Sequence, residues 1–278
     1  MSASRSVKEW LEFISLALES VVENPKREAE LLFRAYMKQD QLWLILHVND
    51  IVPSTPTLFN WIERRTKHEP LEYITNDVSF YSQNFFIKEG ALIPRPETEL
   101  LIDKVLLHVN HNDELTIAEV GVGSGIISII LAQHLPKARF IGVDISPKAL
   151  EVAKINIEKF ELSDRIELRE GSLLTTISEP IDFLVSNPPY IAMDAPLEQN
   201  LSYEPDLALF GGSVGDEIIK ELLNEVEKRH INYFACEMGY DQKAKVEAYV
   251  RDFKVQSLEF YKDYSKFDRG FILRMSDD

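Results

Sequence analysis

Cysteine and long apolar runs are what this sequence most lacks. Its single cysteine, Cys236, lies in the apolar run NYFACEM, so an intrachain disulfide is excluded and a reduced, buried thiol is expected. No apolar run approaches the roughly 20 residues that a membrane-spanning helix needs. The segment MSASRSVKEW also has no apolar signal core. We therefore expect a cytoplasmic protein that neither enters a membrane nor uses redox chemistry.

Positive charge is also scarce. The 278 residues include 30 basic and 46 acidic ones, which gives a formal net charge of −16. Residues 1–75 contain 9 basic and 11 acidic residues, a balance of −2, so −14 belongs to the remainder. Such a charge repels polyanions and weighs against extensive phosphate contacts, although a local basic groove remains compatible with it. We expect no direct nucleic-acid partner.

Helical periodicity fills the first 75 residues. Apolar residues recur at three- and four-residue steps in residues 7–21, and PKREAELLFRAYMK begins with Pro25, which suits the first turn of a helix. A further helix is expected in PTLFNWIERRTK, after the Pro-rich turn VPSTP. We expect residues 1–75 to form a small all-α bundle, a separate domain that recognises the substrate.

The rest of the chain alternates between strands and helices. Residues 78–93 are rich in β-branched and aromatic residues, which predicts a β-hairpin within a linker of residues 76–95. In residues 96–278, a helix is expected in PETELLIDKVLLHV, strands at about 115–120, 138–143, 165–169, 181–186 and 232–238, and helices at about 125–135, 147–160, 214–229 and 241–252. This order predicts an α/β fold with a doubly wound, mostly parallel sheet. The tail offers two more strands, which would pair antiparallel at one edge.

A glycine-rich turn lies between the first of these strands and its helix. In TIAEVGVGSGIISIILA, Gly121, Gly123 and Gly125 let the backbone turn tightly and approach a ligand. The third glycine comes one position earlier than in a dinucleotide fingerprint, and no Walker lysine follows, so a triphosphate is disfavoured. Asp144, nineteen residues after Gly125, can accept hydrogen bonds from ribose hydroxyls. The purely structural alternatives are a tight turn that binds no ligand and a helix cap at Asp144. If a ligand does bind, a dinucleotide and S-adenosylmethionine both remain open.

The strand at about 181–186 ends abruptly in DFLVSNPPYI. Neither Pro188 nor Pro189 can donate to a sheet ladder, so Asn187 and Tyr190 sit at the carboxyl end of a buried strand, where ligands bind in open α/β sheets. A purely structural turn is the alternative. We call residues 187–190 the corner.

AEVGVGSG, the VD pair ending at Asp144 and SNPPY, in this order, resemble the class I S-adenosylmethionine-dependent methyltransferases that methylate a planar nitrogen. The resemblance implies a Rossmann-like fold and S-adenosylmethionine as the methyl donor. It implies that the Asn187 side-chain oxygen and the Pro188 carbonyl accept the N–H bonds of the acceptor, that Tyr190 packs on its planar group and that the prolines fix the corner. The cofactor site that it implies is Glu119, Gly121, Val122, Gly123, Ser124, Gly125, Asp144, Leu173 and Asn187.

A narrower resemblance is to the HemK/PrmC family of release factor glutamine N5-methyltransferases. RRTKHEPLEYI, FFIKEGALIPRPETELLID, YEPDLALFGG, EMGYDQ and DYSKFDRGF carry it over about residues 60–275. It implies peptide chain release factors as substrates, modified at the glutamine of their Gly-Gly-Gln loop. The chain departs from the family at Glu119 and Ser172, where aspartate is usual, and at Asn76, where glycine is usual. A sister group that modifies a ribosomal protein tends to have serine in place of Pro96.

Other readings of the same residues remain. An exocyclic adenine amine of DNA or RNA presents similar geometry to the corner, which makes an adenine N6-methyltransferase the main enzymatic alternative. A non-catalytic binding protein is a second alternative. His108 and His111 are closely spaced, but no cluster of cysteines or carboxylates accompanies them, so we expect no metal site. Arg95, Glu97 and Glu99 fit a site wall and a structural ion-pair network equally well.

Overall fold

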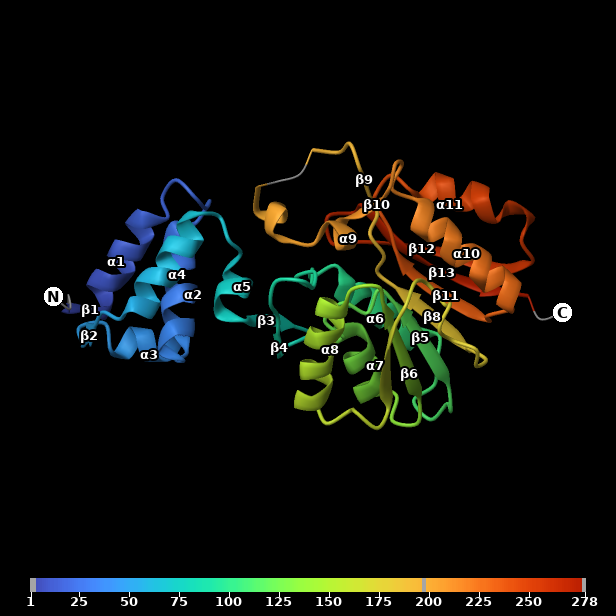
Figure 1. The fold of residues 1–278 in the computed structure, drawn as a ribbon, viewed down its shortest axis with the longest axis horizontal. Helices are drawn as coiled ribbons and strands as arrows, with labels where there is room; N and C mark the ends of the chain where they lie inside the picture. The colour runs from blue at the N-terminus through green and yellow to red at the C-terminus, as the bar shows by residue number, and fades with distance from the viewer. Residues whose placement is uncertain (1–3, 197–198, 277–278) are drawn as a thin grey trace. The chain divides into compact units, whose positions relative to one another are not determined.

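The computed structural model describes residues 4–196 and 199–276. The chain divides into two compact units (Figure 1). One consists of the N-terminal part up to Asp77 together with a short segment that ends at Tyr203, and the other begins at Val78 and contains the rest.

The first unit is a helical bundle. Its elements are β1 (Ser4–Ser6), α1 (Val7–Ala17), α2 (Pro25–Met37), α3 (Gln41–Leu46), β2 (Ile51–Pro53), α4 (Pro56–Thr66) and α5 (Leu71–Thr75), with the 3-10 turn η1 (Gln199–Tyr203). Helix α1 starts in a capping box, because the Ser6 hydroxyl accepts from the Glu9 N–H and the Glu9 carboxylate accepts from the Ser6 N–H. Trp10 is fully buried in the apolar core of this unit. Truncating such a residue to alanine costs about 3–5 kcal/mol.

The expectation of an all-α bundle was incomplete, because β1 and β2 pair antiparallel, with Ser4 opposite Pro53. The Trp10 indole N–H donates to the Val52 carbonyl at 2.9 Å, and the Val7 N–H donates to the Asp50 carbonyl at 3.0 Å. The first bond satisfies the buried indole N–H, and the second satisfies a backbone N–H in the first turn of α1. The segment that precedes α4 therefore runs extended beside the N-terminus.

The second unit is built on a seven-stranded sheet in the order β12-β13-β11-β8-β5-β6-β7. Its strands are β5 (Thr116–Val120), β6 (Arg139–Asp144), β7 (Ile166–Glu170), β8 (Phe183–Ser186), β11 (Tyr233–Glu237), β12 (Val255–Lys262) and β13 (Asp268–Met275). The first five are parallel, and β13 and β12 add antiparallel at one edge. The predicted doubly wound, mostly parallel sheet is thus confirmed, including the antiparallel tail.

Helices cover both faces of this sheet (Figure 1). They are α6 (Thr98–Leu107), α7 (Ile126–His134) and α8 (Pro147–Lys159) on one face, and α10 (Glu217–Arg229) and α11 (Lys243–Tyr249), continued by η2 (Val250–Asp252), on the other. Along β5, Ala118 and Val120 join the core beneath α10 and α11, whereas Glu119 points to the opposite face and bonds to Ser128 of α7. Because side chains alternate between the two faces along β5, the Glu119 carboxylate lies under α7.

The connection between the parts of the chain contains a short hairpin, β3 (Asp77–Phe80) and β4 (Gln83–Phe86), which ends well before the predicted residue 93. Tyr81 and Ser82 make its turn with φ values of +51° and +59°. Asn76, where the family usually has glycine, ends α5 with a left-handed φ of +55°. Asparagine is one of the few residues that tolerates this conformation, which explains how it can stand there.

Three further elements lie beyond the sheet: the short helix α9 (Asp206–Leu209) and the paired strands β9 (Ile191–Ala192) and β10 (Phe210–Gly212). The sequence analysis did not predict them. Among the helices of the described residues, none is both long and apolar enough to cross a lipid bilayer.

Candidate active site

A cavity of about 240 Å³ opens at the carboxyl ends of β5, β6 and β8, where the strand order of the sheet reverses. Most of the residues predicted for the site line it: Glu119, Gly121, Val122, Gly123, Ser124, Asp144, Leu173, Asn187 and Pro189. Gly125, Pro188 and Tyr190 do not line it. The motifs chosen from the sequence therefore converge on one place in the fold.

The three glycines after β5 all have left-handed φ values: +73° at Gly121, +54° at Gly123 and +80° at Gly125. A Cβ added at Gly121 or Gly123 would meet a single protein atom, at the ordinary contact distance of 3.8 Å, so this side of the loop is not tightly packed. A Cβ on Gly125 would meet Ala153 of α8 at 3.2 Å. Gly121 and Gly123 thus shape a cradle, whereas Gly125 packs against a helix.

Asp144 ends β6 and is tied to the glycine loop. Its Oδ2 accepts from the Gly123 N–H and its Oδ1 from the Ser146 N–H, each at 2.9 Å. Ser146 itself caps α8, because its hydroxyl accepts from the Ala149 N–H. Asp144 is therefore not the helix cap. Burial raises the pKa of the Asp144 carboxyl, and the hydrogen bonds from Ser146 and Gly123 oppose that rise.

Glu119 is almost completely buried, with 2% of its surface exposed. Its Oε2 accepts from the Ser128 N–H at 2.9 Å and from the Ser128 hydroxyl. Burial raises the pKa of Glu119 to about 8, although the two bonds from Ser128 work in the opposite direction. One end of the cavity thus holds a carboxyl group that is easily ionised by a nearby positive charge.

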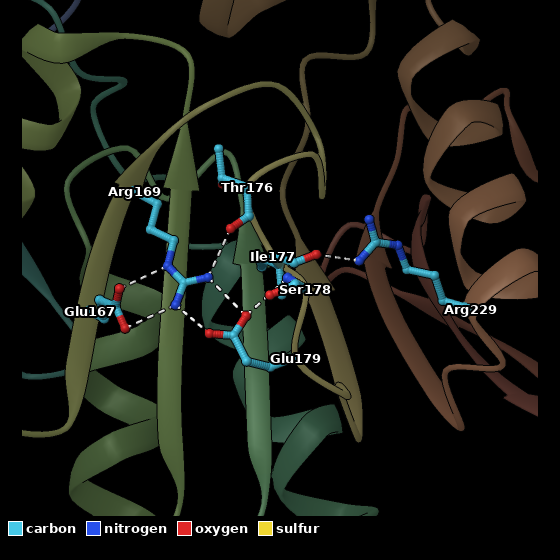
Figure 2. Close-up of polar contacts among 7 residues, drawn as sticks. All are labelled: Glu167, Arg169, Thr176, Ile177, Ser178, Glu179 and Arg229. Atoms are coloured by element: carbon cyan, nitrogen blue, oxygen red, sulfur yellow. Dashed lines mark hydrogen bonds and ion pairs between the residues drawn. The ribbon is translucent and has the colours of Figure 1, made fainter.

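The segment after β7 forms another wall and is held by two arginines (Figure 2). Arg169 donates to the Thr176 carbonyl at 2.9 Å and pairs with Glu179 and Glu167. Arg229 of α10 donates to the carbonyls of Ile177 and Leu174, at 2.7 and 2.8 Å.

Leu173, which the sequence predicted to flank the cofactor, lies in this segment and lines the cavity. It has a left-handed φ of +51°, an unfavourable conformation for a residue with a branched side chain. The arginine contacts hold the backbone on the C-terminal side of this strained position.

At the corner, side chains from three distant segments meet. The Asn187 Nδ2 donates to the Thr98 Oγ1 at 3.1 Å, and the Thr98 hydroxyl donates to the Glu237 Oε2 at 2.7 Å. The Tyr190 hydroxyl donates to the other oxygen of Glu237 at 3.2 Å. Thr98 is the first residue of α6 and Glu237 the last of β11. We call Asn187, Thr98, Glu237 and Tyr190 the corner network.

The corner backbone is also packed tightly from behind. A Cβ on Gly211 would lie 2.3 Å from the Pro189 carbonyl oxygen, and one on Gly215 would lie 2.5 Å from the Tyr190 carbonyl oxygen. Gln242 donates to the carbonyls of Tyr190 and Gly215 at 3.2 and 2.9 Å. These contacts hold the corner in one conformation, which explains two of the glycines in LFGGSVG.

Several cavity residues were not predicted. They include Ala91, Leu92 and Pro94 from the segment after β4, Thr98 of α6, and Pro205, Leu207, Ala208 and Phe210 in and around α9. Leu207 is 63% exposed, which is unusual for a leucine in a short helix. The sequence around it did not indicate that it lines a ligand site. Arg95 pairs with the buried Glu204, and Glu99 accepts from the Tyr81 N–H, so both have structural partners. Neither lines the cavity.

The cavity fits a nucleoside with an amino-acid end. Two carboxyl groups, Glu119 and Asp144, line it together with apolar side chains such as Ile145 and Leu173. The glycine cradle provides room for a ligand where a side chain would otherwise project. The described residues contain no group of three or more histidine, cysteine or acidic side chains that could hold a metal ion.

Comparison with solved structures identifies the same fold. The hMettl16 catalytic domain in complex with a MAT2A 3′UTR hairpin superposes with a TM-score of 0.57 at 15% identity, over 83% of this chain and 86% of that chain. The N-terminal domain of human METTL16 in complex with SAH gives a TM-score of 0.52 at 18% identity, over 69% of this chain and 76% of that chain. At such identities the likeness shows the fold alone.

Sequence comparison is more specific. Residues 9–75 match the PrmC N-terminal domain, and residues 97–201 match the methyltransferase small domain. The release factor glutamine methyltransferase of Clostridium acetobutylicum is 31% identical over 87% of this chain and 88% of its own length. Those of Coxiella burnetii and Moorella thermoacetica are 30% and 35% identical, over 97% and 90% of this chain and 99% and 92% of their own lengths. The chain therefore belongs to the release factor glutamine methyltransferase family.

Proposed function

We propose that this protein transfers a methyl group from S-adenosylmethionine to the side-chain amide nitrogen of a glutamine in a peptide chain release factor. The observation that carries the proposal is the closeness of the glycine cradle to the corner. A Cβ on Gly121 would lie 3.8 Å from the Asn187 carbonyl oxygen, which is ordinary van der Waals contact, and both residues line the same cavity. A donor held by the cradle would therefore lie next to an acceptor held by the corner.

At the donor end, the residues fit the parts of S-adenosylmethionine. The cosubstrate supplies an electrophilic methyl group. Asp144 would accept hydrogen bonds from the ribose hydroxyls, Glu119 would face the charged amino-acid end, and Leu173 would flank the adenine ring. Ser172 also lines the cavity, in the position where the family usually has aspartate, so the side chain available to the adenine ring there is shorter and uncharged.

At the acceptor end, an amide nitrogen is a poor nucleophile because its lone pair is delocalised into the carbonyl group. Positioning therefore matters more than basicity. The Asn187 side-chain oxygen and the Pro188 carbonyl would accept the two N–H bonds of the glutamine and aim its nitrogen at the donor. Tyr190 would pack on the planar amide, with its ring fixed by the hydroxyl bond to Glu237. The methylated nitrogen becomes strongly acidic, so water or the Pro188 carbonyl suffices to remove a proton.

The release factor is the finer part of the proposal. It rests on the names of the relatives and on the match of residues 9–75 to the PrmC N-terminal domain. The alternative acceptors are an adenine base and the glutamine of a ribosomal protein. The net charge of −16 weighs against a polyanionic substrate. We also propose a cytoplasmic location, where release factors act, which cell fractionation would test.

Labelled methyl transfer tests this proposal directly. The protein is incubated with S-adenosylmethionine and, in separate reactions, a release factor, the same factor with Gln→Ala in its Gly-Gly-Gln loop, ribosomal proteins, and unmethylated adenine-containing DNA and RNA. We expect label on the intact factor alone. Label on the Gln→Ala factor would show that the acceptor residue is wrong, and label only on nucleic acid would establish the adenine activity instead.

A further inference from the structure

Glu237 is a carboxyl group that the proposed chemistry does not itself use. It is 1% exposed, and Thr98, which bonds to it, is 3% exposed. Its two oxygens receive hydrogen bonds that lead to the two ends of the corner, one directly from Tyr190 and one through Thr98 to Asn187. A buried carboxylate is costly unless its partners are well placed, so its contacts mark it as a group with a specific role.

The direction of these bonds follows from donor and acceptor chemistry. An ionised carboxylate can only accept, so the single proton of the Thr98 hydroxyl is used toward Glu237. The Thr98 oxygen can then only accept from Asn187, which must present its NH₂ group to it. Asn187 also lines the cavity. The amide oxygen of Asn187 is therefore the atom that is left to accept a hydrogen bond from a substrate.

We propose that Glu237 and Thr98 are positioning residues for methyl transfer: through them the Asn187 amide is held with its oxygen toward the acceptor nitrogen, while Tyr190 is anchored from the same carboxylate. The proposal rests on the proposed function, since it assigns the corner to the acceptor. The oxygen and the NH₂ group of the Asn187 amide are nearly equal in shape, so the bond to Thr98 is what selects between its two orientations. In the flipped orientation the NH₂ group, a donor, would face the N–H donors of the substrate.

Protonation of Glu237 would weaken this control. A protonated carboxyl group has an O–H of its own to donate, so one of the two bonds that it receives must reverse or break. Burial raises the pKa of Glu237 to about 7, against the bonds from Thr98 and Tyr190 and the positive charge of Arg269, and with the help of Glu97. Burial, and after it the charge of Glu237, raise the pKa of the two other titratable groups near it, the Cys236 thiol and the Tyr261 hydroxyl. Since the active form is the ionised one, activity should fall as the pH drops through about 7.

Two variants of Thr98 and one of Glu237 test the activity side of the proposal. Thr98→Val removes the hydroxyl at nearly constant shape, Thr98→Ser restores it, and Glu237→Gln removes the charge. With a release factor as substrate, we expect Thr98→Val to lower kcat by roughly tenfold to a hundredfold with the KM for S-adenosylmethionine changed by less than about twofold. Thr98→Ser should recover most of the loss, and Glu237→Gln should lose the acid limb near pH 7. Thr116→Val, at the amino end of β5 and outside the cavity lining, is the matched control.

A second measurement needs no protein substrate. The ¹³C resonance of the Glu237 carboxyl group, assigned by its absence in Glu237→Gln, is followed against pH in the free protein. We expect a midpoint near 7 in the wild type, a higher midpoint in Thr98→Val and a return toward the wild-type value in Thr98→Ser. Wild-type kcat in Thr98→Val, or a midpoint that Thr98→Val leaves unchanged, would overturn the inference. If the wild type methylates no release factor, the proposed function fails, and the titration still decides whether the corner network exists.

Discussion

At the scale of single residues, Glu119 links ligand binding to proton loss. With its pKa raised to about 8 by burial, this carboxyl group is mostly protonated at pH 7, and its ionised form is the one that burial disfavours. The folded-state pKa lies above the usual value of a glutamate, so the unfolded chain loses this proton first and the stability of the fold decreases as the pH rises from the usual glutamate pKa of 4.5 to about 8. A ligand that brings a positive charge to this end of the cavity reverses the preference.

We therefore expect S-adenosylmethionine to release a proton when it binds at pH 7. Calorimetric titration in two buffers with different ionisation enthalpies should give different observed heats, whose difference corresponds to a release approaching one proton. Affinity should rise between pH 6 and pH 8, because the cost of ionising Glu119 falls as its pKa of about 8 is approached. The control is Glu119→Gln, which should bind with equal heats in both buffers; equal heats in the wild type would contradict the assignment.

Asp144 supports a second prediction at this scale. Asp144→Ala should weaken S-adenosylmethionine binding by about 1–3 kcal/mol, because charge-assisted hydrogen bonds to the ribose hydroxyls are lost. Isothermal titration measures the change. Asp164→Ala, at an exposed position, serves as the comparison and should bind like the wild type. If the Asp144 variant kept full affinity, the ribose would lie elsewhere.

At the scale of elements, the alternating pattern of strands and helices was enough to predict the large sheet, since its inner parallel strands are mostly apolar runs and β7, with the sequence IELRE, alternates apolar and charged residues. The pairs β1–β2 and β9–β10 were missed, because strands of two or three residues carry too little pattern to stand out. Wall residues on α9 were missed for a similar reason.

The same limit holds for the site. The glycine turn, Asp144 and the corner can be recognised in the sequence because each is a local motif at the end of a strand. The corner network does not, because Asn187 and Thr98 are 89 residues apart and Thr98 and Glu237 are 139 apart. Only the fold brings them together: β8 pairs with β11 in the sheet, and α6 packs over one face of that sheet. In such a case a sequence pattern can predict which segments contribute to the site, but not which hydrogen bonds form between them.

The segment after β7 gives a prediction for an element as a whole. Arg169→Met keeps an unbranched side chain but removes the bonds to Thr176 and Glu179 (Figure 2). The strained backbone at Leu173 should then relax, and re-forming it on binding should cost about 1 kcal/mol, a roughly fivefold weaker affinity for S-adenosylmethionine. Measured kcat at saturating cosubstrate should stay near the wild-type value. Arg251→Met removes an exposed arginine and should change neither quantity; a fall in kcat with unchanged affinity in Arg169→Met would contradict this account.

At the scale of the whole molecule, cofactor chemistry and substrate recognition fall on different stretches of the chain. Every predicted cofactor residue lies beyond residue 115 and within the second unit, which also carries most of the negative charge. The first unit has its own apolar core around Trp10 and Phe33, so it can fold around its own residues. We propose that its purpose is to hold the release factor while the second unit performs the chemistry.

A chain that starts at Val78 tests this division of labour. We expect it to bind S-adenosylmethionine with nearly wild-type affinity and to methylate an intact release factor far less efficiently, through a raised KM for the factor, because the recognition surface is gone. The truncation also removes the Lys67 carbonyl to which the Tyr203 hydroxyl donates at 2.6 Å. Tyr203→Phe in the full chain removes that bond alone and is the control, which should retain activity. A short peptide carrying the Gly-Gly-Gln sequence should be methylated equally by both chains, since it is too small to use the helical unit. Equal activity on the intact factor, with Tyr203→Phe also unchanged, would show that the helical unit serves another purpose.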